Sequence, residues 1–194
     1  MKKTNNTKSR IVSSAWRLFY SQGYENTTID DIVADCQSSK GSFYHYFSSK
    51  DELLGTLNIL FDEKYEELEK TMDPDLDPIE KLLYLNHELF LMIENTVSLD
   101  LLGRLLGSQL MAKNDRSLLD TNRTYFKLIR KIAMEGQEKG IFRSDLSTND
   151  ITKIYAMLER SLMYDWCLCN GDYSLQNYSA HVLPTLLKGF CNNQ

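Results

Sequence analysis

The sequence predicts an all-α protein of about nine helices, arranged as a small N-terminal domain followed by a larger C-terminal domain. Apolar residues recur at helical spacing along the 194 residues, and no segment shows the alternation of a strand. The segment 72–78 contains two prolines and three aspartates, which end helices. Residues 1–50 carry a net charge of +3, although the whole chain carries −5, so the remainder carries −8. A basic head on an acidic body is typical of a polyanion-binding module joined to a different kind of domain.

Two amphipathic helices are expected before residue 40. The first follows the spacing of Ile11, Ala15 and Phe19 and ends at Gly23. The second, shorter helix begins after Thr28, a good N-cap that has an aspartate three residues further on. Together they predict the first two helices of a three-helix unit.

A short third helix is expected from Lys40 to about Phe47, with Ser39 as its N-cap. The aromatic residues Phe43, Tyr46 and Phe47 are three and four apart, so they share one face that packs into a core. The remaining residues face outward and can reach a polyanion: Lys40, Gly41, Ser42, Tyr44 and His45. Hydroxyl, ammonium and imidazole groups bind phosphate oxygens, and Gly41 permits close approach. This layout is that of a helix-turn-helix whose third helix enters the major groove of DNA.

A fourth helix is predicted to begin at Ser49, where Ser49-Lys50-Asp51-Glu52 has the form of a capping box, and to run past Leu68. The domain boundary is placed at its start, with a helix-turn-helix DNA-binding domain at 1–50 and a helical regulatory and dimerisation domain at 51–194. Five further helices are expected at 79–94, 99–111, 118–139, 148–169 and 175–190.

Residues 10–54 resemble the DNA-binding domain of the TetR family of bacterial transcriptional regulators. The resemblance rests on Ile11, Ala15, Leu18, Phe19 and Gly23-Tyr24, on Thr27 to Val33, on Ser39 to Phe47 and on Lys50 to Leu54. It implies that Thr28, Ser39, Lys40, Gly41, Ser42, Tyr44, His45 and Lys50 form the contact surface for double-stranded operator DNA.

The chain departs from the family pattern in the turn between the second and third helices. Cys36-Gln37-Ser38-Ser39 stands where the family usually has Ala-Gly-Val-Ser, so a glutamine occupies a position that often needs a positive φ. Glutamine tolerates that conformation less well than glycine, at a cost of about 1 kcal/mol.

The resemblance also implies that the second domain pairs two subunits through its last two helices and encloses a small-molecule pocket. The segment 148–169 is apolar on several faces, so it needs cover both from the core and from a partner. The companion face is assigned to Val182, Leu183, Leu186, Leu187 and Phe190. An apolar or aromatic effector is expected, with Phe90, Met111, Tyr125, Tyr155 and Trp166 as candidate pocket residues.

Several classes of protein find little support. The three histidines lack a metal-ligand spacing, and neither a phosphate-binding glycine loop nor a G-x-S-x-G motif occurs, so we expect no enzyme, no metal and no cofactor. No apolar run is long enough for a membrane helix and the N-terminus does not resemble a signal peptide, so a cytoplasmic protein is expected. The four cysteines form no C-x-x-C pair and are interpreted as reduced.

Three functional hypotheses follow. The first is a dimeric, ligand-responsive transcriptional regulator, most simply a repressor that its effector releases from DNA. The second is a redox-sensing regulator that uses the thiol of Cys167, Cys169 or Cys191. The third is a helical adaptor that binds another protein instead of DNA.

Overall fold

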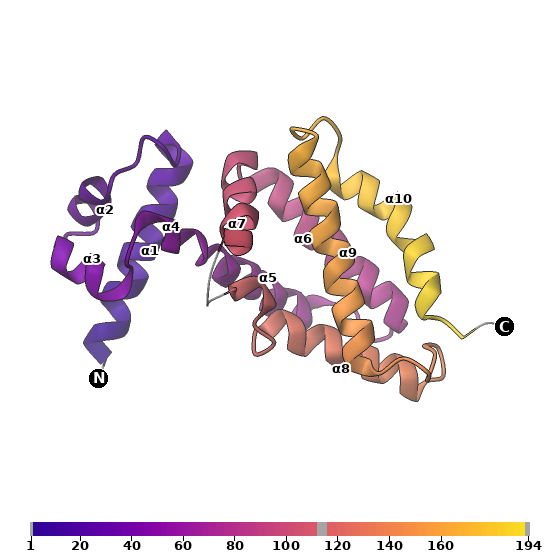
Figure 1. The fold of residues 1–194 in the computed structure, drawn as a ribbon. Coiled ribbons are helices and arrows are strands. Elements are labelled where there is room, and N and C mark those ends of the chain that lie inside the picture. Colours follow the sequence, from indigo (N-terminus) through magenta and orange to yellow (C-terminus); the bar gives the residue numbers. More distant parts are fainter. Residues whose placement is uncertain (1, 112–115, 193–194) are drawn as a thin grey trace. The chain divides into compact units, whose positions relative to one another are not determined.

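The computed structural model describes residues 2–111 and 116–192, and these residues form helices with no extended strand (Figure 1). A single antiparallel bridge pairs Phe142 with Cys191. The helices are α1 (Lys2–Gln22), α2 (Ile29–Asp35), α3 (Lys40–Tyr46), α4 (Lys50–Leu54), α5 (Leu57–Thr71), α6 (Pro78–Thr96), α7 (Leu99–Met111), η1 (Ser117–Leu119), α8 (Thr124–Glu138), α9 (Thr148–Leu168), α10 (Leu175–Leu187) and η2 (Lys188–Phe190). The predicted all-α class is confirmed.

The chain divides into two compact units. Unit 1 contains the described residues up to Asn58 together with those of Val97–Ser117, so it includes α1 to α4 and also α7. Unit 2 contains Ile59–Thr96 and the described residues from Leu118 onward. Helix α7 therefore belongs with the N-terminal helices, although it lies some forty residues further along the chain. The predicted division at residue 50 stays a prediction.

The core of unit 1 forms where α1, α2 and α3 pack against one another. Ile11 and Phe19 of α1, Ile32 of α2 and Phe43 of α3 are almost completely buried there. Phe47, directly after α3, completes the aromatic part of this core with its ring centroid 5.7 Å from that of Phe43. The apolar side of the short aromatic helix is thus internal, as its spacing predicts.

The boundaries of the fourth helix differ from the prediction. The chain forms a five-residue α4 and a separate α5, because the helix breaks at Gly55 and Thr56, where the Thr56 hydroxyl donates to the carbonyl of Leu53 at 2.6 Å. Ser49 makes no side-chain capping bond. The carboxylate of Glu52 instead accepts from the backbone N–H and the hydroxyl of Ser48, so the expected capping box does not form at Ser49.

Two other helices are shorter than predicted. The segment 118–139 begins with the 3₁₀ turn η1 and becomes α-helical only at Thr124. Helix α10 ends at Leu187 and is followed by the 3₁₀ turn η2. Helix α9 begins with a complete capping box formed by Ser147 and Asp150.

Unit 2 is a helical bundle in which α6 packs against α8 and α10, and α9 packs against the same two helices. Its core contains Tyr65 of α5, Leu82 and Phe90 of α6, and Tyr155 of α9. Among the described residues no helix has the length and apolarity needed to cross a membrane.

Candidate nucleic-acid interface and ligand cavity

Helix α3 presents polar and aromatic side chains on the side opposite the core. Lys40, Gly41, Tyr44 and His45 are exposed, whereas Phe43 between them is fully buried. Tyr44 is 55% exposed even though its ring meets that of Phe43 edge-on. The predicted outward set therefore lies together on one surface of a helix whose orientation the buried phenylalanine fixes.

The helix starts near this surface are capped by hydroxyl groups. The Ser39 hydroxyl accepts from the backbone N–H of Ser42 at 3.1 Å, which confirms Ser39 as the N-cap of α3. At the start of α2, Thr28 and Asp31 form the predicted capping box, with Thr28 accepting from the Asp31 N–H at 3.1 Å. Each capping hydroxyl is thus engaged within its own helix start.

The turn between α2 and α3 depends on an unusual residue. Gln37 has φ of +49°, the left-handed conformation that its position in the sequence predicts. The Ser38 N–H donates to the Val33 carbonyl at 2.8 Å and the Gln37 N–H donates to the Ala34 carbonyl at 3.2 Å. These two bonds form a Schellman motif, which ordinarily has glycine at this position.

Arg10 supports the same turn from α1. Its guanidinium donates to the carbonyls of Cys36 and Gln37, the two residues at the end of α2. Arg17, two turns further along α1, pairs with Asp35. Two of the basic side chains in the N-terminal region are therefore engaged with α2 and its turn. Sequence reasoning counted them only as charge, because their partners lie 18 to 27 residues away.

Lys40, the first residue of α3, forms an exposed ion pair with Asp30 of α2 at 2.9 Å. The bond to Asp30 raises the pKa of Lys40, so the ammonium group stays charged at neutral pH. Exposed pairs of this kind contribute little to stability and are weakened by salt. Lys40 can therefore exchange the carboxylate of Asp30 for a phosphate at small cost.

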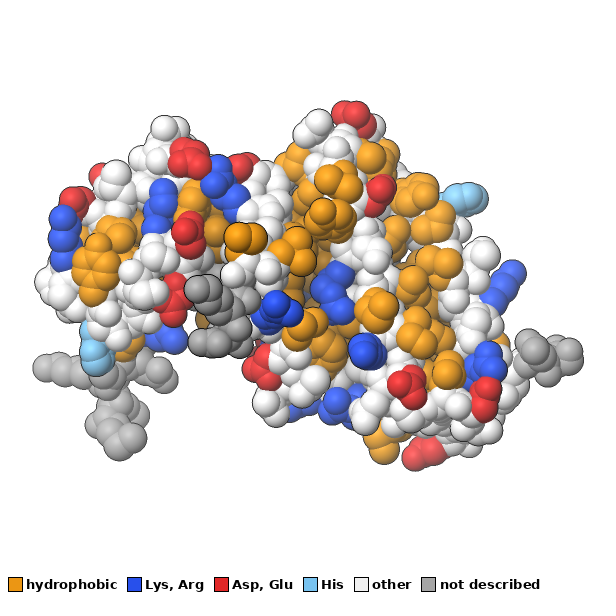
Figure 2. Space-filling model, in the orientation of Figure 1, with side chains coloured by type: hydrophobic (Ala, Val, Ile, Leu, Met, Phe, Trp, Pro, Cys, Tyr) orange, Lys and Arg blue, Asp and Glu red, His pale blue; other side chains and the backbone are white. Residues whose placement is uncertain are grey.

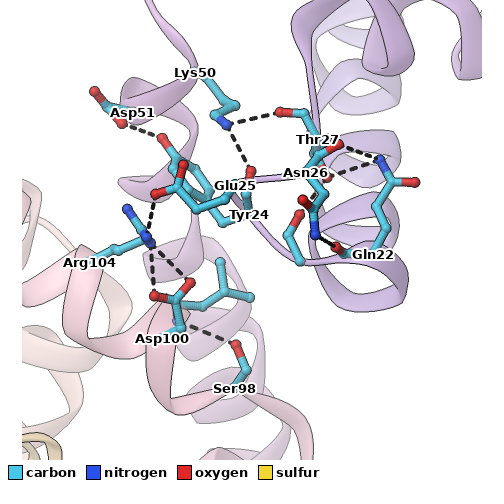
Figure 3. A network of polar contacts seen from close by, with 12 residues as sticks. Gln22, Tyr24, Glu25, Asn26, Thr27, Lys50, Asp51, Ser98, Asp100 and Arg104 are labelled. Carbon is cyan, nitrogen blue, oxygen red and sulfur yellow. Dashed lines mark hydrogen bonds and ion pairs between the residues drawn. The ribbon is translucent and has the colours of Figure 1, made fainter.

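Lys50 is held differently (Figure 3). Its ammonium group donates to the backbone carbonyls of Tyr24 and Thr27 at 2.7 and 2.9 Å and lies 4.1 Å from the centroid of the Tyr24 ring. Arg104 of α7 contacts the same ring, with its guanidinium carbon 4.8 Å from the centroid, and pairs with Glu25. The lysine thus fastens the start of α4 to the loop between α1 and α2.

Tyr24 is the centre of this junction within unit 1. Its side chain is only 3% exposed, and its hydroxyl donates to Asp51 of α4. Burial, and then the bond to Asp51, raise the pKa of the Tyr24 phenol, so the hydroxyl keeps its proton. One side chain therefore connects the α1–α2 loop, α4 and α7.

Unit 2 contains a small, partly open cavity of about 30 Å³ lined by residues of α5, α6, η1, α8 and α9 and by Arg123. By the usual volume of an occupied cavity this is room for roughly two water molecules. Most of its wall is apolar, with a single carboxyl group and two arginines. The lining residues are Phe61, Tyr65, Leu89, Leu118, Arg123, Tyr125, Ala156, Glu159, Arg160 and Met163.

The carboxyl group is that of Glu159, which is 2% exposed. It accepts from the Tyr125 hydroxyl at 2.7 Å, from the Asn86 amide at 3.0 Å and from the Tyr65 hydroxyl at 3.5 Å. Burial raises the pKa of Glu159, while the bonds from Asn86 and Tyr125 act in the opposite direction. The sequence did not single out Glu159, because a glutamate on a long helix reads as a surface residue.

The five predicted pocket residues divide into three groups. Tyr125 lines the cavity, and it alone of the five does so. Phe90, Tyr155 and Trp166 are core residues of unit 2; the Tyr155 hydroxyl donates to the Leu82 carbonyl at 2.8 Å and the Trp166 indole to the Tyr173 carbonyl at 2.8 Å. Met111 belongs to unit 1 and its side chain is 83% exposed.

Helices α9 and α10 each expose several large apolar side chains. Hydrophobic atoms gather on the face of these two helices in Figure 2. The exposed residues are Met157, Tyr164 and Leu168 on α9, and Tyr178 and Leu186 on α10. Three members of the companion face predicted from sequence, Leu183, Leu187 and Phe190, are instead buried in their own unit.

The thiols and the acidic side chains suggest no further chemistry. All four cysteines are free, and burial raises the pKa of the Cys167 thiol, which lowers its thiolate fraction. Within residues 2–111 and 116–192 no group of three histidine, cysteine or acidic residues could hold a metal ion.

Two short capped helices, α2 and α3, joined by a tight turn and with one side of α3 exposed, form a helix-turn-helix module. Residues 11–57 match the model of the bacterial regulatory proteins of the tetR family, and residues 56–189 match the model of the C-terminal region of YsiA-like proteins. The chain belongs to the TetR family of transcriptional regulators.

Similar proteins include characterised and uncharacterised regulators. The HTH-type transcriptional repressor DhaR of Mycobacterium sp. strain GP1 is 29% identical over 151 residues, which are 72% of each chain. The uncharacterised HTH-type regulator YxaF of Bacillus subtilis strain 168 is 27% identical over 195 residues, covering 97% of this chain and 98% of YxaF.

Two solved structures share the fold. FadR of Thermus thermophilus in complex with lauroyl-CoA gives a TM-score of 0.77 at 22% identity over 96% of each chain. FadR of Bacillus subtilis in complex with stearoyl-CoA gives a TM-score of 0.70 at 20% identity, over 94% of this chain and 99% of that one.

Proposed function

We propose that the protein is a homodimeric transcriptional repressor that binds operator DNA through α3 and is released by a small ligand with a large apolar portion. The observation that carries the proposal is the outward surface of α3. Lys40, Tyr44 and His45 are exposed there on a helix whose start is capped by Ser39 and whose back is fixed by Phe43. Lysine and histidine supply charge and donors for phosphates and base edges, and Tyr44 supplies both a hydroxyl and a ring.

The DNA-binding surface comprises the predicted residues in three roles. Lys40, Gly41, Tyr44 and His45 make direct contact, with Gly41 allowing the helix to lie close to the groove wall. Thr28, Ser39 and Ser42 lie at the two helix starts, where phosphates bind, and their hydroxyl groups hold these starts in shape through the caps. Lys50 acts mainly by positioning, because two carbonyls already accept from its ammonium group.

A dimer is needed because one seven-residue helix reads only a few base pairs. The exposed apolar residues of α9 and α10 support a symmetric four-helix interface between two copies. In this arrangement the two heads contact two half-sites of an inverted repeat.

The proposed effector enters unit 2 at the cavity beside Glu159. Apolar walls favour an acyl or ring system, and the FadR structures from Thermus thermophilus and Bacillus subtilis contain acyl-CoA molecules. The cavity of about 30 Å³ is much smaller than the several hundred Å³ of a typical ligand pocket. The ligand must therefore displace wall residues, and this displacement gives it a preference between conformations of the protein.

The proposal is tested with the intergenic DNA next to the protein's own gene, in electrophoretic retardation at several salt concentrations. Lys40→Ala should weaken binding to all sequences and lower the magnitude of the salt slope by about 1, since one phosphate contact is lost. Lys127→Ala, which removes an exposed lysine of α8 in unit 2, is the matched control and should leave both unchanged.

Equal affinity and salt slope for Lys40→Ala and the control would contradict the role of α3. Failure of the wild-type protein to retard any DNA would favour the adaptor hypothesis. Loss of DNA binding on treatment with peroxide, and its recovery with a thiol reductant, would favour the redox hypothesis, which the free and partly buried cysteines do not support by themselves.

A further inference from the structure

The carboxyl group of Glu159 connects all five long helices of unit 2. It lies on α9 and accepts from Tyr65 of α5, Asn86 of α6 and Tyr125 of α8. Asn86 in turn accepts from the hydroxyl of Ser179 on α10. Replacing this carboxyl group with an apolar side chain would leave the buried donors of Tyr125 and Asn86 without their acceptor, so the group already has a structural role. Its position at a cavity wall gives it a second use.

The hydrogen bonds that Glu159 accepts from Tyr125, Asn86 and Tyr65 differ in length, and the Tyr155 hydroxyl, which donates to the Leu82 carbonyl, also faces the carboxyl group. Tyr125 at 2.7 Å and Asn86 at 3.0 Å are well-formed donors, whereas the Tyr65 hydroxyl at 3.5 Å is beyond the usual range for O–H···O bonds. Tyr125 and Tyr65 approach the same oxygen, Oε2, and both rings line the cavity. Because the Tyr65 hydroxyl is too distant for a strong bond, Oε2 of Glu159 can accept a further hydrogen bond on the side that faces Tyr65 and the cavity.

The charges around the cavity balance. Arg123 is held by Asp62 through bonds of 2.9 and 3.2 Å, which makes a neutral pair. Arg160, next to Glu159 in sequence, also lines the cavity and offsets the carboxylate. Because these charges already balance, a charged ligand would add an uncompensated buried charge, and the balance therefore favours a neutral group at this point.

We propose that Glu159 accepts a hydrogen bond from a hydroxyl group on the effector, which takes the place of the Tyr65 hydroxyl. The effector is then a neutral molecule with an apolar body and an alcohol at the end that reaches Glu159. A hydroxyl group is about as large as the water molecules for which the cavity has room. This inference rests on the proposed effector cavity and specifies the chemistry that it recognises.

Replacement of the Tyr65 hydroxyl by the ligand hydroxyl also gives the ligand a way to change the conformation of the protein. Tyr65 belongs to α5, the helix that follows α4 in the chain. A ligand that releases Tyr65 from Glu159 and pushes the apolar wall outward changes how α5 packs against α8 and α9. A differential affinity of this kind is what an effector needs to shift a conformational equilibrium.

The test uses two isomeric probes, 1-octanol and heptyl methyl ether, which have the same atoms but only one of which can donate a hydrogen bond. Calorimetric titration of the full-length protein should give at least about tenfold tighter binding of 1-octanol, the usual range for a hydrogen bond to a charged group. Octylamine, which carries a charge, should bind more weakly than 1-octanol.

Glu159→Gln should reduce the preference for 1-octanol to about threefold or less, because the amide offers one acceptor oxygen in place of two. Glu135→Gln, which removes a carboxylate of α8 that is bound to Lys81 and Lys139 outside the cavity, is the matched control and should keep the preference. Tyr65→Phe leaves Glu159 in place and should bind 1-octanol as tightly as the wild type or more tightly. It remains informative if Glu159→Gln does not fold.

Equal binding of the two isomers, tighter binding of octylamine, or loss of 1-octanol binding in Tyr65→Phe would each overturn this inference. Lauroyl-CoA separates that failure from failure of the proposed function. If lauroyl-CoA releases operator DNA while the isomers bind equally, the repressor model stands and the hydroxyl recognition falls. If neither lauroyl-CoA nor 1-octanol alters operator binding, the effector model and the inference that rests on it both fall.

Discussion

At the scale of single residues, the DNA-binding head is organised by contacts that span long stretches of sequence. Arg10 supports the end of α2, and Lys50 binds the carbonyls of Tyr24 and Thr27. The sequence analysis counts Arg10 only as charge and assigns Lys50 to the DNA contact surface, because residue type does not show which backbone carbonyls a side chain will reach. The caps formed by Thr28 and Ser39 were predictable, since each hydroxyl binds an N–H only three residues away.

The left-handed conformation of Gln37 gives the first prediction at this scale. Gln37→Gly should stabilise the head by about 1 kcal/mol, because glycine adopts φ of +49° without the contact between Cβ and the following carbonyl. The matched control is Ser38→Gly at the next position, where φ is not positive, which should give no gain. Amide hydrogen exchange in α2 and α3 measures the change as slower opening. Faster exchange in Gln37→Gly would show that the glutamine side chain makes a stabilising contact.

At the scale of helices, the existence and order of the elements follow from apolar spacing, but several ends do not. The pattern of leucines continues across Gly55 and Thr56, where the structure breaks the helix into α4 and α5. The position of the break depends on which side-chain hydroxyl binds which backbone carbonyl. Here the Thr56 hydroxyl donates to the carbonyl of Leu53. Competition between neighbouring caps, such as Ser48 and Ser49 for Glu52, is decided by packing rather than by residue type.

Gly136 in α8 gives a prediction about helix packing. A Cβ at this position would lie 2.1 Å from the ring of Phe142, which is 1% exposed and cannot move outward. Gly136→Ala should therefore destabilise unit 2 by about 1–3 kcal/mol, the usual cost of overpacking. This loss outweighs the gain of about 1 kcal/mol that alanine brings to a helix interior.

The control for Gly136→Ala is Gly103→Ala in α7, where no atom lies within 4 Å of the added Cβ. It should raise the stability of the protein slightly, through helix propensity alone. Thermal unfolding by circular dichroism distinguishes the two substitutions. A higher melting temperature for Gly136→Ala would mean that Phe142 can repack.

At the scale of the whole molecule, the sequence predicted the helices of the proposed interface but misjudged which side of α10 is exposed. Leucines occur on several faces of α9 and α10, so residue type alone did not distinguish core from surface. The structure buries Leu183 and Leu187 and leaves Leu186 45% exposed. A similar ambiguity affected the cavity: aromatic residues such as Phe90 and Trp166 fill the core, and the polar centre Glu159 was not apparent from the sequence.

The final prediction tests the proposed dimer. Leu168→Glu combined with Leu186→Glu places two charges per subunit on the exposed face of α9 and α10, where the side chains are 65% and 45% exposed. Because a two-fold axis brings the same patch of both subunits together, like charges would oppose one another at a cost of several kcal/mol. Light scattering should show monomers, and operator binding should fall sharply because a single head reads too few base pairs.

The control for this double variant is Leu110→Glu on α7. Leu110 is 68% exposed and lies outside this face, so its substitution should leave the dimer intact. A double variant that remains dimeric, with a circular dichroism spectrum like that of the wild type, would place the interface elsewhere on the molecule.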